Sequence, residues 1–351
     1  MRIGIVGLPN VGKSTLFNAL THARAESSNY PFCTIEPNLG IVSVPDQRVE
    51  WLASHYKTKS TINATISFLD IAGIVKGASE GEGLGNKFLG HIREVDAILH
   101  VVRCFDNPDI IHVEGHADPI RDINTINLEL ILADLESVIR QLLKTKHPMN
   151  APLGDPLLLK IKTALEGGQK ASSVEGAENF GLITAKPVIY CANLDEEHMH
   201  TGNHHFERVV EFARESSSVV VPICAKVESE LALIDNKSER TEFMSLYNLE
   251  KSGLDKLIEA GYRTLGLISF LTAGEPEVRA WTIPDGTKAP GAAGRIHTDF
   301  ERGFIRAEVI SFDDFVKHGS MLKAKESGRV RSEGKDYVVK DGDVVHFRFN
   351  V

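Results

Sequence analysis

The sequence predicts an α/β fold built on a mostly parallel sheet, and three observations support this class. Short apolar runs alternate with helical patterns, which is typical of parallel strands that helices cover on both faces. A glycine-rich loop directly follows the first apolar run. A C-terminal stretch does not follow this alternation of strands and helices, and instead has short strands between turn residues. The strands expected in the parallel sheet are residues 2–6, 41–44, 65–69, 97–102, 187–192 and 218–223.

The composition is that of an ordinary globular protein with more than one domain. The chain has 351 residues, 42% of them hydrophobic and 25% charged, so two or three domains are expected. No apolar run approaches the roughly 20 residues of a membrane-spanning helix, and no signal-peptide pattern is present, so no membrane partner is expected. The four cysteines form no Cys-x-x-Cys pair, which favours reduced thiols in a cytoplasmic protein. A net charge of −9 argues against a surface that coats nucleic acid everywhere.

Residues 7–15 carry the strongest motif, Gly-Leu-Pro-Asn-Val-Gly-Lys-Ser-Thr, which matches the P-loop pattern between a strand and a helix over 13–21. Glycines let backbone N–H groups approach phosphates closely, and the helix directs its positive dipole end at them. Lys13 can reach the β- and γ-phosphates, and Ser14 offers a hard oxygen to Mg²⁺. The expected phosphate-binding residues are Asn10, Val11, Gly12, Lys13, Ser14 and Thr15.

A second motif, Asp70-Ile-Ala-Gly73, follows the strand at 65–69. Asp70 is placed to reach Mg²⁺ directly or through water, and Gly73 can donate its N–H to the γ-phosphate. Thr34 lies between the two motifs, where a switch-loop hydroxyl can also bind Mg²⁺. A loop hydroxyl bonded only to nearby backbone is the alternative for Thr34. Ser14, Thr34 and Asp70 are therefore the candidate Mg²⁺ ligands.

The base site is expected at two further strand ends. GTPases place Asn-Lys-x-Asp where this chain has Asn193-Leu194-Asp195-Glu196, so Glu196 replaces the aspartate that accepts hydrogen bonds from guanine. The longer carboxylate and the apolar Leu194 shift the expected base toward adenine, so ATP becomes plausible. After another strand, Cys224-Ala225-Lys226 resembles the last guanine-site segment, and its lysine stem could cover either base. GTP therefore remains an alternative nucleotide.

Residue 74 is where many GTPases have a glutamine that orients the attacking water. Here it is Ile74, which can neither donate nor accept a hydrogen bond, so another group must do this work. Five glycines follow, and we interpret them as a mobile switch segment gated by nucleotide, with a plain flexible loop as the alternative. They are Gly77, Gly81, Gly83, Gly85 and Gly90.

A helical insertion interrupts the α/β alternation. Leucine and isoleucine recur at spacings of four and three at Leu128, Leu132, Leu135, Ile139 and Leu142, which predicts a long amphipathic helix. A second helix is expected over 155–165, ended by two glycines. We interpret the pair as an antiparallel helical arm inserted between strands; an ordinary surface helix on the sheet is the alternative.

The C-terminal region is predicted to be a small α+β domain. Strands are expected at 278–283, 304–310, 336–339 and 344–349, with a helix at 312–318. Residues 317–340 hold seven basic and three acidic side chains, so a local basic surface is expected there. A solvated surface without a partner is the alternative.

Together these motifs resemble the Obg-like ATPase family, also called YchF, which belongs to the P-loop GTPase superfamily. The matching segments are residues 7–15, 29–38, 70–79, 193–196, 279–284 and 294–300. The resemblance implies a G domain at 1–127 and 182–272, an inserted helical arm at 128–181 and a ubiquitin-like TGS domain at 273–351. It also implies slow hydrolysis of ATP, which is preferred over GTP or comparable to it. Ribosome association and a role in translation or stress control are implied as well, with a possible rRNA contact through the C-terminal region.

Two residue roles come with this resemblance. Family members carry a histidine proposed to serve catalysis where the glutamine is missing, which makes His112 and Lys13 the catalytic candidates. A structural histidine is the alternative for His112. The P-loop asparagine of related GTPases is linked to K⁺, which makes Asn10 a candidate K⁺ ligand; a turn-stabilising asparagine is the alternative.

The leading hypothesis is a regulatory nucleotide hydrolase whose bound state controls ribosome docking. A small-molecule P-loop kinase and a binding module with structural nucleotide are the alternatives from other classes. Four histidines close in sequence suggest a metal, but their spacing fits no usual zinc site, so a solvated loop is expected there. They are His198, His200, His204 and His205.

Overall fold

The computed structural model describes residues 1–22, 38–71, 84–112, 115–144 and 155–350. These residues form two compact units. The first comprises residues 1–42 and 67–264, and the second comprises residues 43–66 and 265–351. Thr34, Gly73 and Ile74 lie outside the described residues.

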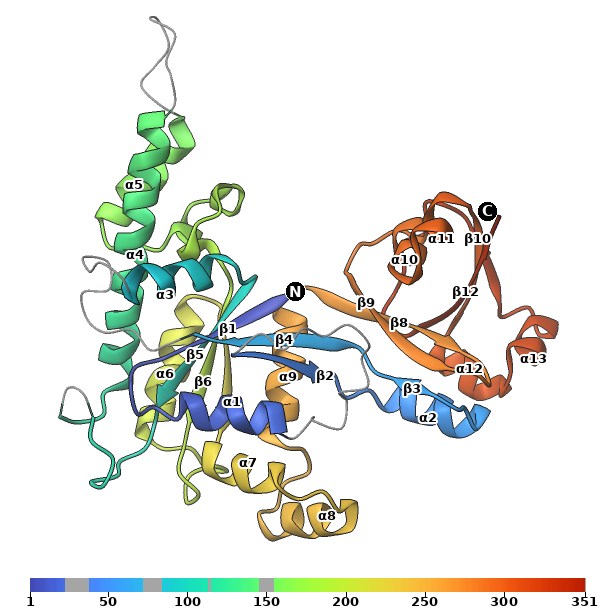
Figure 1. The fold of residues 1–351 in the computed structure, drawn as a ribbon, viewed down its shortest axis with the longest axis horizontal. Coiled ribbons are helices and arrows are strands. Elements are labelled where there is room, and N and C mark those ends of the chain that lie inside the picture. Colours follow the sequence, from blue (N-terminus) through green and yellow to red (C-terminus); the bar gives the residue numbers. More distant parts are fainter. Residues whose placement is uncertain (23–37, 72–83, 113–114, 145–154, 351) are drawn as a thin grey trace, which may run out of the picture. The chain divides into compact units, whose positions relative to one another are not determined.

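The first unit is built on a six-stranded sheet in the order β2-β4-β1-β5-β6-β7 (Figure 1). β1 pairs in parallel with β4 and β5, β5 pairs in parallel with β6, and β6 with β7. Buried isoleucine, valine and leucine side chains fill both faces, as parallel sheets require. The strands are β1 Arg2–Val6, β2 Leu39–Ser43, β4 Thr65–Asp70, β5 Ala97–Arg103, β6 Val188–Asn193 and β7 Val219–Ile223.

Helices connect and cover these strands. The helix α1 that follows the P-loop packs against α7, and α9 packs on β6 and β7. The helices of this unit are α1 Lys13–His22, α3 Leu84–Arg93, α4 Pro119–Lys144, α5 Pro156–Glu166, α6 His204–Glu215, α7 Ala225–Ala232, α8 Lys237–Leu246 and α9 Gly253–Thr264. Short 3-10 turns lie at Ala171–Ser173, Ala177–Phe180 and Ile183–Ala185.

All six strands predicted for the parallel sheet are present, with ends that differ by one or two residues. Of the five glycines predicted to form a switch segment, Gly85 and Gly90 lie within α3, and Gly77, Gly81 and Gly83 lie outside the described residues. Two of the four clustered histidines also differ: His204 and His205 begin α6, and His205 is buried.

The predicted helical pair is present, but it buries a different face. α4 begins at Pro119, well before the predicted arm, and runs side by side with α5 in the opposite direction (Figure 1). The shared cluster takes Ile131, Leu135, Val138 and Leu142 from α4. Three members of the predicted stripe are substantially exposed instead, namely Leu128, Leu132 and Ile139. Two neighbouring ridges of this helix share the same three-and-four spacing, and only the position of α5 decides between them.

Hydrogen bonds anchor this arm to the following segment. The buried Asp134 carboxylate of α4 accepts from the backbone N–H groups of Ile183 and Thr184 at 2.9 and 2.7 Å. The Thr184 hydroxyl donates to the same carboxylate at 2.7 Å and accepts from the N–H of Ala171. The carboxylate therefore fixes where the chain leaves the arm and returns to β6. α5 begins at an Asp155 cap and ends at Gly167.

The second unit contains a mixed six-stranded sheet in the order β11-β10-β12-β8-β9-β3. β10 pairs antiparallel with β11 and β12, β8 pairs antiparallel with β9, and the β12–β8 and β3–β9 pairs are parallel. Its core joins aromatic rings such as Phe270 and Phe347 to the small residues of α10. The strands are β3 Thr61–Ile62, β8 Leu267–Ala273, β9 Val278–Pro284, β10 Phe304–Ser311, β11 Arg331–Glu333 and β12 Asp343–Phe349. The helices are α2 Gln47–Tyr56, α10 Ala289–Ile296, α11 Thr298–Arg302, α12 Phe312–His318 and α13 Met321–Glu326.

The α+β class predicted for the C-terminal region is confirmed, with corrections inside it. Residues 336–339 form no strand; Val338 makes only an isolated bridge to Lys288. β8 was missed because the predicted domain began at residue 273, where this strand ends. The predicted boundaries also differ from the compact units at residues 43–66, because α2 packs on β8 and β9 and β3 pairs with β9. Among the helices of the described residues, none is long and apolar enough to cross a bilayer.

Candidate functional site: a nucleotide pocket at the strand ends

The P-loop lies between β1 and α1, and its backbone needs the residues that the sequence supplies. Asn10 and Gly12 have positive φ angles of 63° and 95°, a region that asparagine and glycine adopt most readily. A Cβ at Gly7 would lie 2.8 Å from the carbonyl oxygen of Val101 on β5, and one at Gly12 would collide with the Asn193 amide. The loop is therefore pressed against β5 and β6, with its N–H groups at the start of a helix.

Asn193, at the end of β6, joins three segments of the site. Its Nδ2 donates to the carbonyl oxygen of Val11 at 2.8 Å, and its Oδ1 accepts from the N–H of Ala225 at 3.0 Å. The side chain is buried, with 5% of its surface exposed. One amide therefore fixes the phosphate loop relative to residues 224–226, which explains why the sequence needs asparagine rather than a simple hydrophobic side chain here.

The phosphate end of the site holds the polar groups that the sequence predicts. The Lys13 ammonium forms an ion pair with Asp70, at the end of β4. Ser14 and Thr15 are exposed at the first turn of α1, whereas Val11 is buried. A serine hydroxyl and a carboxylate are hard oxygen donors of the kind Mg²⁺ prefers, so Ser14 and Asp70 fit the metal that this fold class generally uses. Thr34 and Gly73, the other residues predicted here, lie outside the described ranges.

The base end of the site combines an apolar floor with an ion pair. Leu194 is buried, and its N–H donates to the carbonyl oxygen of Ile223 on β7 at 2.8 Å. Lys226 Nζ lies 2.5 Å from Glu196 Oε1. This hydrogen bond, together with the carboxylate charge, raises the pKa of Lys226. The carboxylate that replaces the guanine-binding aspartate is thus already engaged by a cation.

The base end and part of the P-loop line one pocket of about 510 Å³, large enough for a nucleoside, whereas Lys13, Ser14 and Asp70 are not among its lining residues. Most of the predicted nucleotide-binding residues line it. The lining residues are Asn10, Gly12, Thr15, Phe105, Asn107, Ile110, Asn193, Leu194, Asp195, Glu196, Cys224, Ala225, Lys226 and Ser229.

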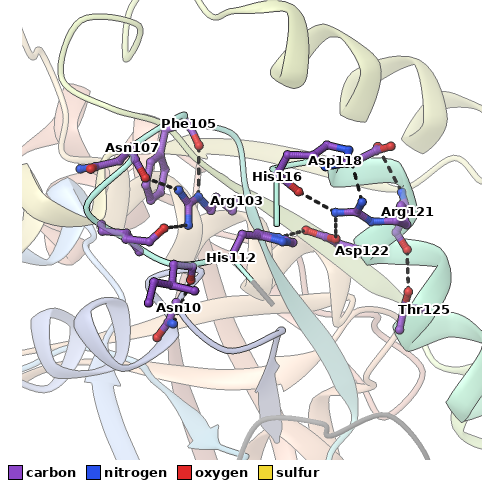
Figure 2. Close-up of polar contacts among 12 residues, drawn as sticks. Asn10, Arg103, Phe105, Asn107, His112, His116, Asp118, Arg121, Asp122 and Thr125 are labelled. Atoms are coloured by element: carbon purple, nitrogen blue, oxygen red, sulfur yellow. Dashed lines mark hydrogen bonds and ion pairs between the residues drawn. The ribbon is translucent and has the colours of Figure 1, made fainter. Parts of the chain in front are cut away.

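One wall of this pocket was missed by the sequence analysis. It is the loop after β5, which supplies Phe105, Asn107 and Ile110, and it is held by Arg103 (Figure 2). The buried guanidinium donates to the carbonyl oxygens of Phe105, Ile110 and Asn107 at 3.1, 3.0 and 3.1 Å, and its Cζ lies 4.6 Å from the centre of the Phe105 ring. Burial lowers the pKa of Arg103. A buried arginine at the end of a mostly apolar strand is the signal that could have revealed this loop.

The same loop continues to the residues predicted to serve catalysis. Asn10 Nδ2 donates to the carbonyl oxygen of Ile111 at 3.0 Å, so the P-loop and this loop are in direct contact (Figure 2). The His112 ring is buried, with 6% of the residue exposed, and its Nε2 lies 2.8 Å from Asp122 Oδ2 on α4. His112 therefore adjoins the site without lining the pocket. Asp122 was not singled out from the sequence.

Comparisons with known proteins agree with this geometry. Residues 2–143 match the family model described as "50S ribosome-binding GTPase", and residues 267–350 match a model of the C-terminal region of YchF GTPases, described as a protein of unknown function. The chain is 53% identical to the "Ribosome-binding ATPase YchF" of Bacillus subtilis over 362 residues, covering 99% of each chain. It is 51% identical to the protein of the same name from Escherichia coli O157:H7, covering 100% of this chain and 99% of that one.

A solved structure extends the likeness to the fold. The YchF GTPase of Schizosaccharomyces pombe superposes with a TM-score of 0.87 at 39% identity, covering 99% of this chain and 97% of that one. The relatives match along nearly their whole lengths, in both compact units. This chain therefore belongs to the YchF family of P-loop nucleotide hydrolases.

Proposed function

We propose that this chain is a ribosome-associated NTPase that hydrolyses ATP, and GTP in second place, to the diphosphate and phosphate. The observation that carries the proposal is the buried Asn193 amide, which holds a P-loop and a base-binding segment around one pocket. The names of the curated relatives, which call them ribosome-binding ATPases, support the same activity and partner. Nucleotide-dependent ordering of the loops around the phosphates would make the protein a switch in translation or stress response.

The phosphates would be held by Lys13 and by the N–H groups of the P-loop. Ser14 and Asp70 would hold Mg²⁺, together with Thr34, and Mg²⁺ would neutralise charge on the phosphate oxygens. The Lys13–Asp70 ion pair supports this, because it places the cation and the carboxylate beside each other at the phosphate end. Gly73 would add its N–H at the γ-phosphate. Lys13 stabilises the charge that develops in the transition state.

Adenine is the proposed base. The Glu196 carboxylate already pairs with Lys226, so guanine could donate hydrogen bonds to it only in competition with this ion pair. The buried Leu194 offers an apolar surface that either purine can contact. The S. pombe relative is titled a GTPase and the bacterial relatives are named ATPases, so the nucleotide preference is part of the proposal and needs a direct measurement.

His112 is the proposed water-orienting residue in place of the missing glutamine. The 2.8 Å contact with Asp122 would hold the imidazole in one tautomer and orientation. The buried ring reaches the γ-phosphate only if the loop that carries it shifts, and the contact between Asn10 and Ile111 links such a shift to the P-loop. Asn10 also remains the candidate K⁺ ligand through its side-chain oxygen.

The proposed partner is the ribosome, and the proposed location is therefore the cytoplasm. The basic stretch at 317–340 supports rRNA contact, because all seven of its lysine and arginine residues are exposed. We propose that residues 273–351 serve as the TGS-type domain, that residues 128–181 serve as the inserted arm, and that residues 1–127 and 182–272 form the G domain, except for residues 43–66 and 265–272, which pack with the C-terminal unit.

A paired titration tests the nucleotide assignment. Purified protein is titrated with non-hydrolysable ATP and GTP analogues, and phosphate release is then followed with each triphosphate, with and without K⁺. We expect tighter binding of the ATP analogue, phosphate release without an added acceptor, and loss of binding in Lys13→Ala. A preference for GTP would overturn the adenine assignment, and a requirement for an acceptor would indicate a kinase.

Cosedimentation with ribosomes tests the partner separately. Binding should weaken steeply with salt, because neutralising phosphates releases counterions. Replacing Lys323, Lys325 and Lys335 by glutamine should reduce both the affinity and the salt slope, and the same exchange at Lys57 and Lys59 of the same unit is the control. A flat salt dependence would contradict the rRNA contact.

A further inference from the structure

Three side chains with metal-binding donors come together beside the nucleotide pocket. Asp106 belongs to the loop after β5, and His204 and His205 are the first residues of α6. One donor atom from each lies within 4.8 Å of the other two. Among the residues that the structure describes, this is where three such groups converge. The sequence could not show it, because Asp106 lies about a hundred positions from the two histidines.

The two histidine rings lie next to each other, and one of them is buried and contacts Asp106. Their centres lie 3.9 Å apart, and His205 Nε2 lies 3.2 Å from Asp106 Oδ2. His205 is 5% exposed, and its buried Nδ1 finds no hydrogen-bond partner in the described part of the chain. A buried polar atom of this kind calls for a water that completes its surroundings, while the other ring nitrogen, Nε2, faces Asp106 and is the donor available to an ion. Asp106 and His204 are exposed, so the cluster is open to solvent on one side.

The backbone around the cluster is fixed on both sides. Asn203, which caps α6, accepts from the N–H of Phe206 and donates its Nδ2 to the carbonyl oxygen of Cys104 at 2.7 Å. This bond holds the first turn of α6 beside the residues that precede Asp106. Arg208, one turn further along α6, pairs with Asp118 at 3.1 Å, so part of its positive charge is neutralised.

We propose that Asp106, His204 and His205 form a binding site for a borderline divalent transition metal, with Zn²⁺ as the reference ion. Two imidazole nitrogens and one carboxylate oxygen are donors that Zn²⁺ takes at about 2.0–2.2 Å. Donors within 4.8 Å of one another can close around such an ion by small side-chain rotations. The solvent-facing side leaves room for water as the remaining ligand, so the ion would be exchangeable.

Metal binding requires neutral imidazole. Burial lowers the pKa of His205, which favours this neutral form.

The ion would couple α6 to the pocket wall. Asp106 stands between Phe105 and Asn107, which both line the nucleotide pocket. A metal bound to Asp106 and to the two histidines would hold this loop on α6 in addition to the contacts from Arg103. Loop order would then depend on metal occupancy, independently of whether the pocket prefers ATP or GTP.

Isothermal titration of the full chain with Zn²⁺ tests the site, in excess Mg²⁺ and without nucleotide. We expect one equivalent to bind to the wild type, and His204→Ala and Asp106→Ala to weaken its binding at least about tenfold. Both side chains are exposed, so the fold should survive. His200→Ala is the matched control, because His200 lies in the preceding turn outside the cluster, and it should bind Zn²⁺ as the wild type does.

Hydrogen exchange gives a second readout on the same proteins. Zn²⁺ should slow exchange at residues 104–110 in the wild type and in His200→Ala, but not in His204→Ala. Unchanged Zn²⁺ affinity in both His204→Ala and Asp106→Ala would overturn the proposal. An equal loss of Zn²⁺ affinity in the control variant His200→Ala would also overturn the proposal, because the ion would then bind elsewhere. Neither result would affect the proposed hydrolase activity.

Discussion

The two walls of the nucleotide pocket are held in different ways. The wall at 193–196 and 224–226 is fixed by Asn193. Its two hydrogen-bond partners, Val11 and Ala225, lie 182 and 32 positions away from it in the sequence. The wall at 105–110 is fixed by Arg103, whose three acceptors lie two to seven positions away. The first wall depends on the assembled sheet, whereas the second is a local loop around one buried cation.

This difference separates the roles of the walls. A change at Asn193 should disturb phosphate and base binding together, because the same amide positions both segments. A change at Arg103 should loosen one loop and leave the P-loop in place.

Asn193→Ala should have the largest effect. It leaves the Val11 carbonyl and the Ala225 N–H without their buried partner, which costs about 2–4 kcal/mol of unfolding free energy. Affinity for ATP and GTP analogues should fall together by at least about tenfold. Denaturant unfolding and nucleotide titration measure both effects. Asn107→Ala is the control, because Asn107 lines the same pocket, but its side-chain oxygen accepts from the N–H of Asp109 in its own loop, at 2.9 Å, and not from another segment of the site.

If Asn107→Ala loses as much stability as Asn193→Ala, the distinction between a wall fixed by the sheet and a local wall is wrong. If Asn193→Ala weakens the binding of only one of the two nucleotides, the amide does not position both segments.

His112→Ala should lower the rate of hydrolysis by about 10²-fold, the usual size of a lost proton-transfer or water-orienting group. Nucleotide affinity should change little, since His112 does not line the pocket. Asp122→Asn should lower the rate less, because the imidazole remains but loses its orienting carboxylate. Single-turnover phosphate release measures the rate. His116→Ala, an exposed histidine in the same segment, should behave as the wild type.

An unchanged rate in His112→Ala would remove its assigned role. A matching loss of nucleotide affinity would show instead that the buried His112–Asp122 pair only supports the fold.

Arg103→Lys should have a moderate effect. Lysine keeps the charge, but it cannot donate to three carbonyl oxygens in the planar arrangement of a guanidinium. We expect a loss of about 1–3 kcal/mol in unfolding free energy and faster hydrogen exchange at 105–110, with little change at the P-loop. Arg208→Lys, a half-exposed arginine with one contact to Asp118, is the control. Equal acceleration at residues 7–15 would show that the walls are not independent.

Lys226→Met should have the smallest effect. The exposed ion pair with Glu196 is worth little by itself, so affinity for the ATP analogue should change by no more than about fivefold. Relative affinity for GTP should rise, because the Glu196 carboxylate is released for guanine. Lys226→Ala removes the aliphatic stem of the side chain as well, and it should lower the affinity for both the ATP and the GTP analogue. A fall in relative GTP affinity in Lys226→Met would contradict the role given to the ion pair.

Much of this molecule could be predicted from local patterns. The strands of the parallel sheet, the P-loop and the two base-site segments were recognisable because each depends on residues close together in sequence. Asn193, Leu194 and Lys226 were placed in the site for that reason, and they line the pocket. The buried face of α4 was not predictable, because two ridges with the same spacing compete and only α5 distinguishes them.

The sequence by itself determined the fold class, the phosphate-binding chemistry and the departure from the usual guanine site, since these follow from residue type and short-range order. Only the tertiary structure decided that residues 43–66 pack with the C-terminal unit, that His112 pairs with Asp122, and that Asp106 meets two histidines. The physical reason is the same in each case. Such contacts join residues through packing between elements, and their energies depend on distances that no local pattern records.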